Sequence, residues 1–133
     1  MKRGLIIFLL FFNVQLKAQQ TSSTEVDPFE ITIEYHYNQV FLTSTNGCNW
    51  LGLNFNFFNH EDPKLLDNVG VSVYSPKLVD EIKSDRSFMF ILTKSETTFE
   101  LKALKGTNWE ELSFEYSENY TKVTLTENGI TRQ

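Results

Sequence analysis

The chain has 133 residues, with 12 basic and 17 acidic side chains and a formal net charge of −5. A surface this acidic lacks the clustered Lys and Arg that bind a phosphate backbone or an anionic membrane, so we expect no nucleic-acid partner. Cys48 is the single cysteine, which excludes a disulfide within the chain. The fold must therefore be held by the packing of side chains, in agreement with its 12 phenylalanines, of which Phe8, Phe11 and Phe12 lie in the apolar N-terminal run.

The N-terminus has the pattern of a secretory signal peptide. A basic start, Met1 to Arg3, precedes an apolar run at residues 5–12 that is too short to span a bilayer. Ala18 supplies the small residue that signal peptidases require, so we expect cleavage between Ala18 and Gln19. Because Gln19 and not Cys follows the cut, we expect no lipid anchor there. The sequence thus predicts a secreted or periplasmic protein with no stable membrane insertion after cleavage.

Removal of this signal peptide, residues 1–18, takes away Lys2, Arg3 and Lys17 but no acidic residue. The mature chain of 115 residues then has 9 basic and 17 acidic side chains, a net charge of −8. This length suits one domain with a modest core. Residues 19–28 are polar and are predicted to form a flexible leader, and residues 29–133 are predicted to form the domain.

The first predicted strand runs from Phe29 to Tyr37, where apolar and polar residues alternate strictly. This period of two indicates a strand with one buried and one solvated face. Val40 and Leu42 continue the apolar signal with the opposite parity. The change predicts a bulge or a tight turn near Asn38.

The next strand is predicted over residues 51–58, immediately after the turn dipeptide Asn46-Gly47. One face of this strand should pack in the core. It carries Leu51, Leu53, Phe55 and Phe57. The opposite face is left for solvent or for a ligand. It carries Trp50, Asn54, Asn56 and Phe58, with Gly52 in their midst.

The second half of the chain predicts one helix and a run of strands. After a strand at residues 69–74, Ser75 and Pro76 have the pattern of an N-cap and first helical residue, and the helix is expected to reach Lys83. Residues 88–92 are apolar at all five positions, which predicts a strand covered on both sides. Strands at residues 99–103, 112–116 and 123–125 follow, separated by short polar turns.

About eight strands and one short helix predict an all-β fold, a single antiparallel β-sandwich of Ig-like or Greek-key type. A small closed β-barrel is the alternative. The strand at residues 88–92 favours the sandwich, because strands of a simple barrel alternate between lumen and solvent. No solenoid-type internal repeat is apparent.

Trp50, Asn54, Asn56 and Phe58 are the candidate ligand-binding residues. A flat aromatic ring can stack on a sugar, while amide groups donate and accept hydrogen bonds that fix its orientation. Gly52 would let a ligand approach the backbone. The alternative interpretation is structural, with Trp50 lying across Gly52 or under the helix.

We expect no catalytic, metal or cofactor site. The chain has no Gly-x-Ser-x-Gly elbow, and no His or basic residue flanks Cys48. Glu110 and Glu111 are adjacent, so on a strand they would point to opposite faces. His60, Glu61 and Asp62 share one loop, but their spacing matches no known metal motif.

The sequence therefore favours a secreted, non-enzymatic binding or adhesion module that recognises a glycan or a protein segment through an exposed sheet face. Two alternatives remain open. One is a small β-barrel that carries an apolar ligand in an internal cavity. The other is a structural or assembly subunit that pairs with another chain through an edge strand.

Overall fold

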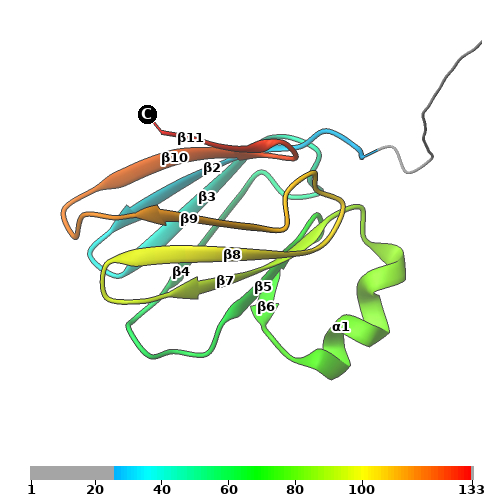
Figure 1. The fold of residues 1–133 in the computed structure, drawn as a ribbon, viewed down its shortest axis with the longest axis horizontal. Coiled ribbons are helices and arrows are strands. Elements are labelled where there is room, and N and C mark those ends of the chain that lie inside the picture. Colours follow the sequence, from blue (N-terminus) through cyan, green and yellow to red (C-terminus); the bar gives the residue numbers. More distant parts are fainter. Residues whose placement is uncertain (1–25, 133) are drawn as a thin grey trace, which may run out of the picture.

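The computed structural model describes residues 26–132, which form two five-stranded antiparallel sheets that face each other as a sandwich (Figure 1). The predicted all-β sandwich is confirmed, and the alternative of a closed barrel is not what the chain forms. Sheet 1 has the strand order β11 (Gly129–Arg132), β10 (Thr121–Thr126), β2 (Glu30–His36), β3 (Gln39–Asn46) and β4 (Gly52–Asn56). Sheet 2 has the order β6 (Val71–Val73), β5 (Lys64–Asp67), β7 (Met89–Lys94), β8 (Thr98–Lys105) and β9 (Glu111–Glu115).

The strand count in the described residues is ten, two more than the sequence predicts. The additional strands are β5 and β11, while Val69 lies in the turn between β5 and β6. The parity change near Asn38 is a tight turn, since Tyr37 and Asn38 have φ values of 44° and 68° between β2 and β3. The predicted signal peptide and most of the predicted leader lie outside the described residues.

Helix α1 (Pro76–Ile82) forms where the sequence predicts it and continues as the 3₁₀ turn η1 (Lys83–Asp85). The Ser75 hydroxyl accepts a hydrogen bond from the Leu78 N–H at 3.3 Å, which satisfies one of the free donors of the first turn. The helix lies outside sheet 2 (Figure 1), where Val79 packs with Leu65 and Met89 in a small second core. A helix this short depends on such docking for its stability.

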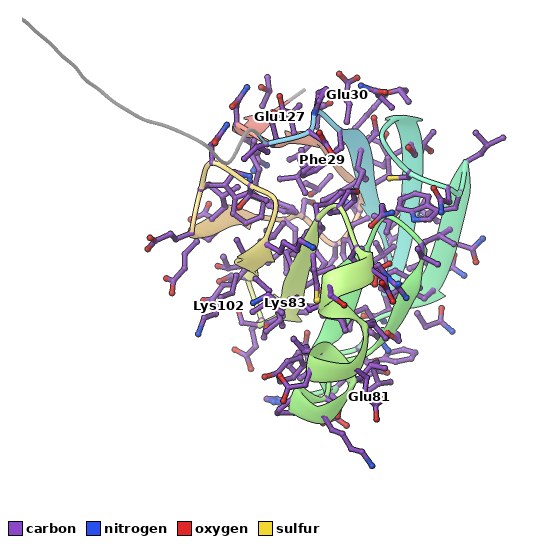
Figure 2. All side chains as sticks on the ribbon, turned by 90° about the vertical axis from the view of Figure 1, so that its right-hand side faces the viewer. Phe29, Glu30, Glu81, Lys83, Lys102 and Glu127 are labelled. Atoms are coloured by element: carbon purple, nitrogen blue, oxygen red, sulfur yellow. The ribbon has the colours of Figure 1, made fainter. Side chains whose placement is uncertain are left out.

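β7 is covered on both sides, as its apolar sequence predicts. Met89 faces helix α1, while Phe90 and Leu92 face the main core between the two sheets. The rings of Phe29 and Phe88 stack there with centroids 4.1 Å apart. The Phe29 N–H also donates a hydrogen bond to the Glu127 carboxylate at 3.0 Å. Both residues lie at the end of the molecule away from α1 (Figure 2).

The chain contains an internal structural repeat with an offset of 59 residues. The strands β2 to β6 of the first repeat return as β7 to β11 in the second, and the bounds of β3 and β4 shift by this offset to give those of β8 and β9. The pairing registers agree as well, because Tyr35 opposes Val40 and Lys94 opposes Phe99. The pairing register shifts after Glu30 in β2, and it shifts again after the equivalent residue Met89 in β7.

Each repeat is divided between the two sheets. The first three strands of a repeat form a meander in one sheet, and its last two strands form a hairpin that joins the meander of the other repeat, so that β10 pairs with β2 and β5 pairs with β7. β10 thus returns by a long connection to lie beside β2, which gives the Greek-key order β10-β2-β3-β4. The equivalent residues Phe29 and Phe88 stack where the two repeats meet.

The sequence signature of the repeat is Gly-x-Asn-Trp-x-x-Leu-x-Phe, at residues 47–55 and again at 106–114. Nine residues of the first repeat are identical to those 59 positions later: Phe29, Leu42, Gly47, Asn49, Trp50, Leu53, Phe55, Leu66 and Gly70. Except for glycines and Asn49, the identical residues are apolar. The repeat therefore preserves what the core and the turns require.

Gly47 and Gly106 explain why the signature begins with glycine. Both have positive φ values, 87° and 79°, which side chains rarely tolerate. A Cβ atom on Gly47 would lie 2.6 Å from the Cβ of Phe29, and one on Gly106 would lie 2.7 Å from the Cα of Phe88. Each glycine thus lets the loop before β4 or β9 pass against the start of the first strand of its repeat.

We predict that Gly47→Ala and Gly106→Ala each lower the free energy of unfolding by about 2 kcal/mol or more, because strain and a steric clash combine. Urea denaturation followed by circular dichroism measures this change. Gly70→Ala is the control, since a Cβ there would meet nothing within 4 Å. Equal losses for all three variants would contradict the role assigned to the two signature glycines.

Candidate functional site

Trp50 does not belong to an exposed binding face, which corrects the prediction from the sequence. Its side chain is only 8% exposed and packs in the main core, and its Nε1 donates a hydrogen bond to the Asp67 carbonyl at 3.1 Å. The alternation of β4 does not extend back to Trp50, because residues 47–51 form a loop and the strand begins at Gly52. For the same reason Leu51, expected in the core, is 84% exposed.

Trp109 makes the same contacts as Trp50 in the second repeat. It is also 8% exposed, and its Nε1 donates to the Thr126 carbonyl at 3.0 Å. The preceding asparagines repeat this pattern, since Asn49 N–H donates to the Asn68 carbonyl at 2.7 Å and Asn108 N–H to the Glu127 carbonyl at 2.8 Å. Each Asn-Trp pair thus fastens its loop to a hairpin of the opposite sheet, which is a structural role.

Asn54, Asn56 and Phe58, the other predicted site residues, are exposed. Asn54 lies directly opposite Phe41, and Asn56 lies opposite Gln39, on the outer face of sheet 1. Phe41 is 37% exposed, so an aromatic ring does stand beside the amides, but Phe41 supplies it and not Trp50. The outward parity of Phe41 between the buried Val40 and Leu42 was the sequence signal for this.

Side chains that can form hydrogen bonds border Phe41 on the same face. Glu34 lies opposite Phe41 in β3 and opposite Lys122 in β10. The Tyr120 hydroxyl donates to the Glu34 carboxylate at 2.6 Å, and this bond raises the pKa of Tyr120 above its usual value. This face of sheet 1 can therefore offer hydrogen-bonding groups.

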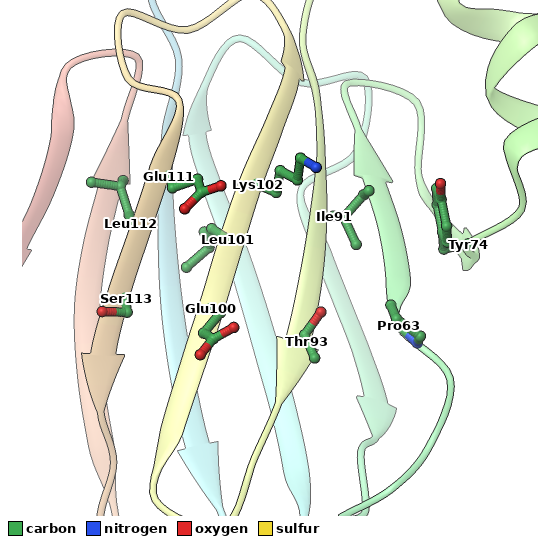
Figure 3. Close-up of a pocket in the computed structure, with 10 residues that line it drawn as sticks. All are labelled: Pro63, Tyr74, Ile91, Thr93, Glu100, Leu101, Lys102, Glu111, Leu112 and Ser113. Carbon is green, nitrogen blue, oxygen red and sulfur yellow. The ribbon is translucent and has the colours of Figure 1, made fainter.

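A groove of about 640 Å³ lies on the outer face of sheet 2 (Figure 3). Tyr74, which follows β6, forms one wall, and side chains of β7, β8 and β9 form the floor and the opposite side. Its volume is within the range of small-molecule sites. The groove is lined by Pro63, Tyr74, Ile91, Thr93, Glu100, Leu101, Lys102, Glu111, Leu112 and Ser113.

The groove combines apolar and hydrogen-bonding groups in separate rows. Tyr74 and Ile91 give one side an aromatic ring and an aliphatic surface. Toward β9, the register places Lys102 opposite Glu111 and Glu100 opposite Ser113, so two carboxylates, an ammonium group and a hydroxyl share the other side. Such a surface can stack on one face of a ligand and hold several of its hydroxyl groups.

The groove and the Phe41 face are equivalent positions of the two repeats. Glu100 corresponds to Phe41 and Ser113 to Asn54, at the offset of 59 residues. The sheets differ because Tyr74 lines the groove on sheet 2 (Figure 3), next to α1, whereas no helix covers sheet 1 in the described residues. The wall thus belongs to the connection between the repeats, and the alternation of residues along the strands does not predict where this connection lies in space.

Other candidate chemistry is weak in the part of the chain that the structure describes. Cys48 is half-buried, and burial raises the pKa of its thiol, which disfavours the nucleophilic thiolate. Among residues 26–132, no group of three or more His, Cys, Asp or Glu side chains is arranged to hold a metal ion. Nor does any helix within that range have the length and apolar character needed to cross a membrane.

Comparisons with protein families, with curated proteins and with solved structures found no match for this chain.

We predict that the fluorescence of both tryptophans is blue-shifted and resists acrylamide quenching, because both indoles are buried and hydrogen-bonded to backbone carbonyls. Trp50→Phe and Trp109→Phe separate the two signals and form a matched pair. Each should destabilise the fold by about 1–3 kcal/mol, because a buried carbonyl loses its partner. A red-shifted, readily quenched Trp50 in the Trp109→Phe variant would contradict its assignment to the core.

Proposed function

We propose that the protein is a secreted binding module that holds a short glycan in the groove of sheet 2. The observation that carries the proposal is the pairing of an aromatic wall, Tyr74, with a row of hydrogen-bonding side chains across a groove of about 640 Å³. Sugars present one apolar face and a rim of hydroxyl groups. The groove offers a partner for each.

The charges in the groove favour a neutral or amino sugar over an acidic one. Glu100 and Glu111 outnumber Lys102, and the predicted mature chain has a net charge of −8. A carboxylate or sulfate on the ligand would meet repulsion from these groups and from the whole surface. Carboxylates accept hydrogen bonds from sugar hydroxyls and pair with an ammonium group.

A carrier of an apolar ligand is less consistent with the fold. That function would require a barrel lumen, whereas the apolar side chains of both sheets pack against one another. An assembly role through an edge strand is compatible with glycan binding, because the groove lies on a sheet face and not at an edge.

We predict that Tyr74→Leu and Glu111→Gln each weaken glycan binding by about tenfold or more, which corresponds to about 1.4 kcal/mol. Tyr74→Leu keeps an apolar side chain against the helix but removes the aromatic face. Glu111→Gln keeps the shape and removes the charge. Screening the mature chain on a glycan array and then titrating the best neutral or amino sugar by calorimetry provides the measurement.

Phe41→Ala is the matched control, because Phe41 occupies on sheet 1 the position that Glu100 occupies in the groove. It should leave the affinity unchanged. Loss of binding in Phe41→Ala with normal binding in Tyr74→Leu would move the site to the Phe41 face. A mature chain that binds no glycan on the array would refute the proposed function.

A further inference from the structure

We propose that the protein forms a symmetric dimer in which strand β4 of one chain pairs antiparallel with β4 of a second copy. β4 is the last strand of sheet 1, so pairing would join the two copies of sheet 1 into one continuous sheet. This inference goes beyond the proposed function and does not depend on it, since the groove lies on the other sheet.

The backbone of β4 is available for such pairing. The Leu51 carbonyl accepts from Ser44 N–H at 2.9 Å, and the Phe57 N–H donates to the Asn38 carbonyl at 2.6 Å. In an antiparallel ladder, alternate residues of a strand bond to the same neighbour. The N–H and C=O groups of Gly52, Asn54 and Asn56 therefore point away from β3, toward the open edge of the sheet.

The sequence of β4 is complementary to itself. When two copies pair antiparallel about Asn54, each Leu53 opposes Phe55 of the other copy, and each Gly52 opposes Asn56. Apolar side chains thus meet on the inner face, amides meet on the outer face, and no charged side chain is present in β4. Such cross-strand pairs stabilise a sheet.

The equivalent edge strand β9 has features that oppose this pairing. About Ser113, antiparallel self-pairing of β9 would place Glu111 opposite Glu115 of the other copy, and like charges directly opposite are destabilising. The Glu115 carbonyl is already occupied, because Arg132 Nη1 donates to it at 3.0 Å. At the position equivalent to Arg132, the first repeat has Val73, which has no side-chain donor.

Exposed apolar side chains lie on the side of the sandwich formed by β4 and β6, but not at the equivalent positions on the side formed by β9 and β11. Leu51 is 84% exposed, Val69 46% and Val73 53%. The residues 59 positions later, at the edge formed by β9 and β11, are polar or charged. They are Glu110, Asn128 and Arg132. Proteins protect free edges with charge. β9 carries charged side chains of its own, whereas β4 carries none and is approached by the Lys64 ammonium of sheet 2, which lies 5.8 Å from the Phe55 ring.

Sedimentation of the mature chain over a concentration series tests the dimer. The wild type should approach the mass of two chains as the concentration rises. Asn54→Glu, which places two carboxylates opposite each other on the symmetry axis, should weaken dimerisation about tenfold or more. The control is Ser113→Glu, the same change at the equivalent exposed position of β9, which should dimerise as the wild type does.

A cysteine cross-link tests the register independently of affinity. In a Cys48→Thr background, which introduces the residue found at the equivalent position 107, Asn54→Cys should form a disulfide-linked dimer on mild oxidation. Directly opposed residues of a hydrogen-bonded pair have Cα atoms about 5.5 Å apart, within the range of a disulfide. Ser113→Cys in that background should remain mostly uncross-linked.

A wild type that remains monomeric at the highest concentration reached would overturn the proposal. So would a dimer that Asn54→Glu and Ser113→Glu weaken equally, or equal cross-linking of the two cysteine variants. Thermal melting of each variant checks that the variant is folded, so that unfolding does not account for a change in dimerisation. Retained glycan binding in a monomeric Asn54→Glu variant would separate this inference from the proposed function.

Discussion

The indole N–H bonds of Trp50 and Trp109 join the two sheets at equivalent positions of the two repeats. Each indole lies in a loop of one sheet and donates to a carbonyl at the end of a strand in the other, Asp67 in β5 and Thr126 in β10. A buried N–H without a partner would be costly, so each indole fixes its hairpin at a defined position. Because the two hairpins are those that the repeats exchange, the two bonds hold the repeats together at both sides of the core.

Alternation and capping signals in the sequence were sufficient to predict the fold class, the helix and most strands. They missed the short strand β5, which does not alternate. Lys64–Asp67 has three consecutive buried residues, because its outer face lies under α1 and its inner face lies in the core. Trp50 was misplaced because a loop precedes β4 and changes the parity. The signature around Gly47 and Gly106 was visible in the sequence, but a search for solenoid periods does not detect a single repetition.

The repeat separates what the fold requires from what varies between its two halves. Leu65 and Met89, which lie under α1, correspond to Thr124 and Glu30 on the sheet that no helix covers in the described residues. The residues at these positions are therefore apolar where the helix covers the sheet and polar where it does not. The groove also depends on this segment, because its wall, Tyr74, lies in the connection between the repeats, just before α1. Of the predicted site, only the exposed positions Asn54, Asn56 and Phe58 could be located from periodicity, since side chains from separate strands meet only through the sheet register.

The pairing of β2 with β10 has a mechanical consequence for the folded chain. β2 begins next to Thr126, whereas β11 runs from that same end of the sheet toward Val123 and ends at Arg132. Tension between Phe29 and Arg132 therefore has a component along the strands, perpendicular to the hydrogen bonds that join them. This component loads both the β10–β11 and the β2–β10 ladders in shear, so that several hydrogen bonds of each ladder share it. The hairpin contributed by the second repeat thus lies between Phe29 and Arg132 and transmits the load from one to the other.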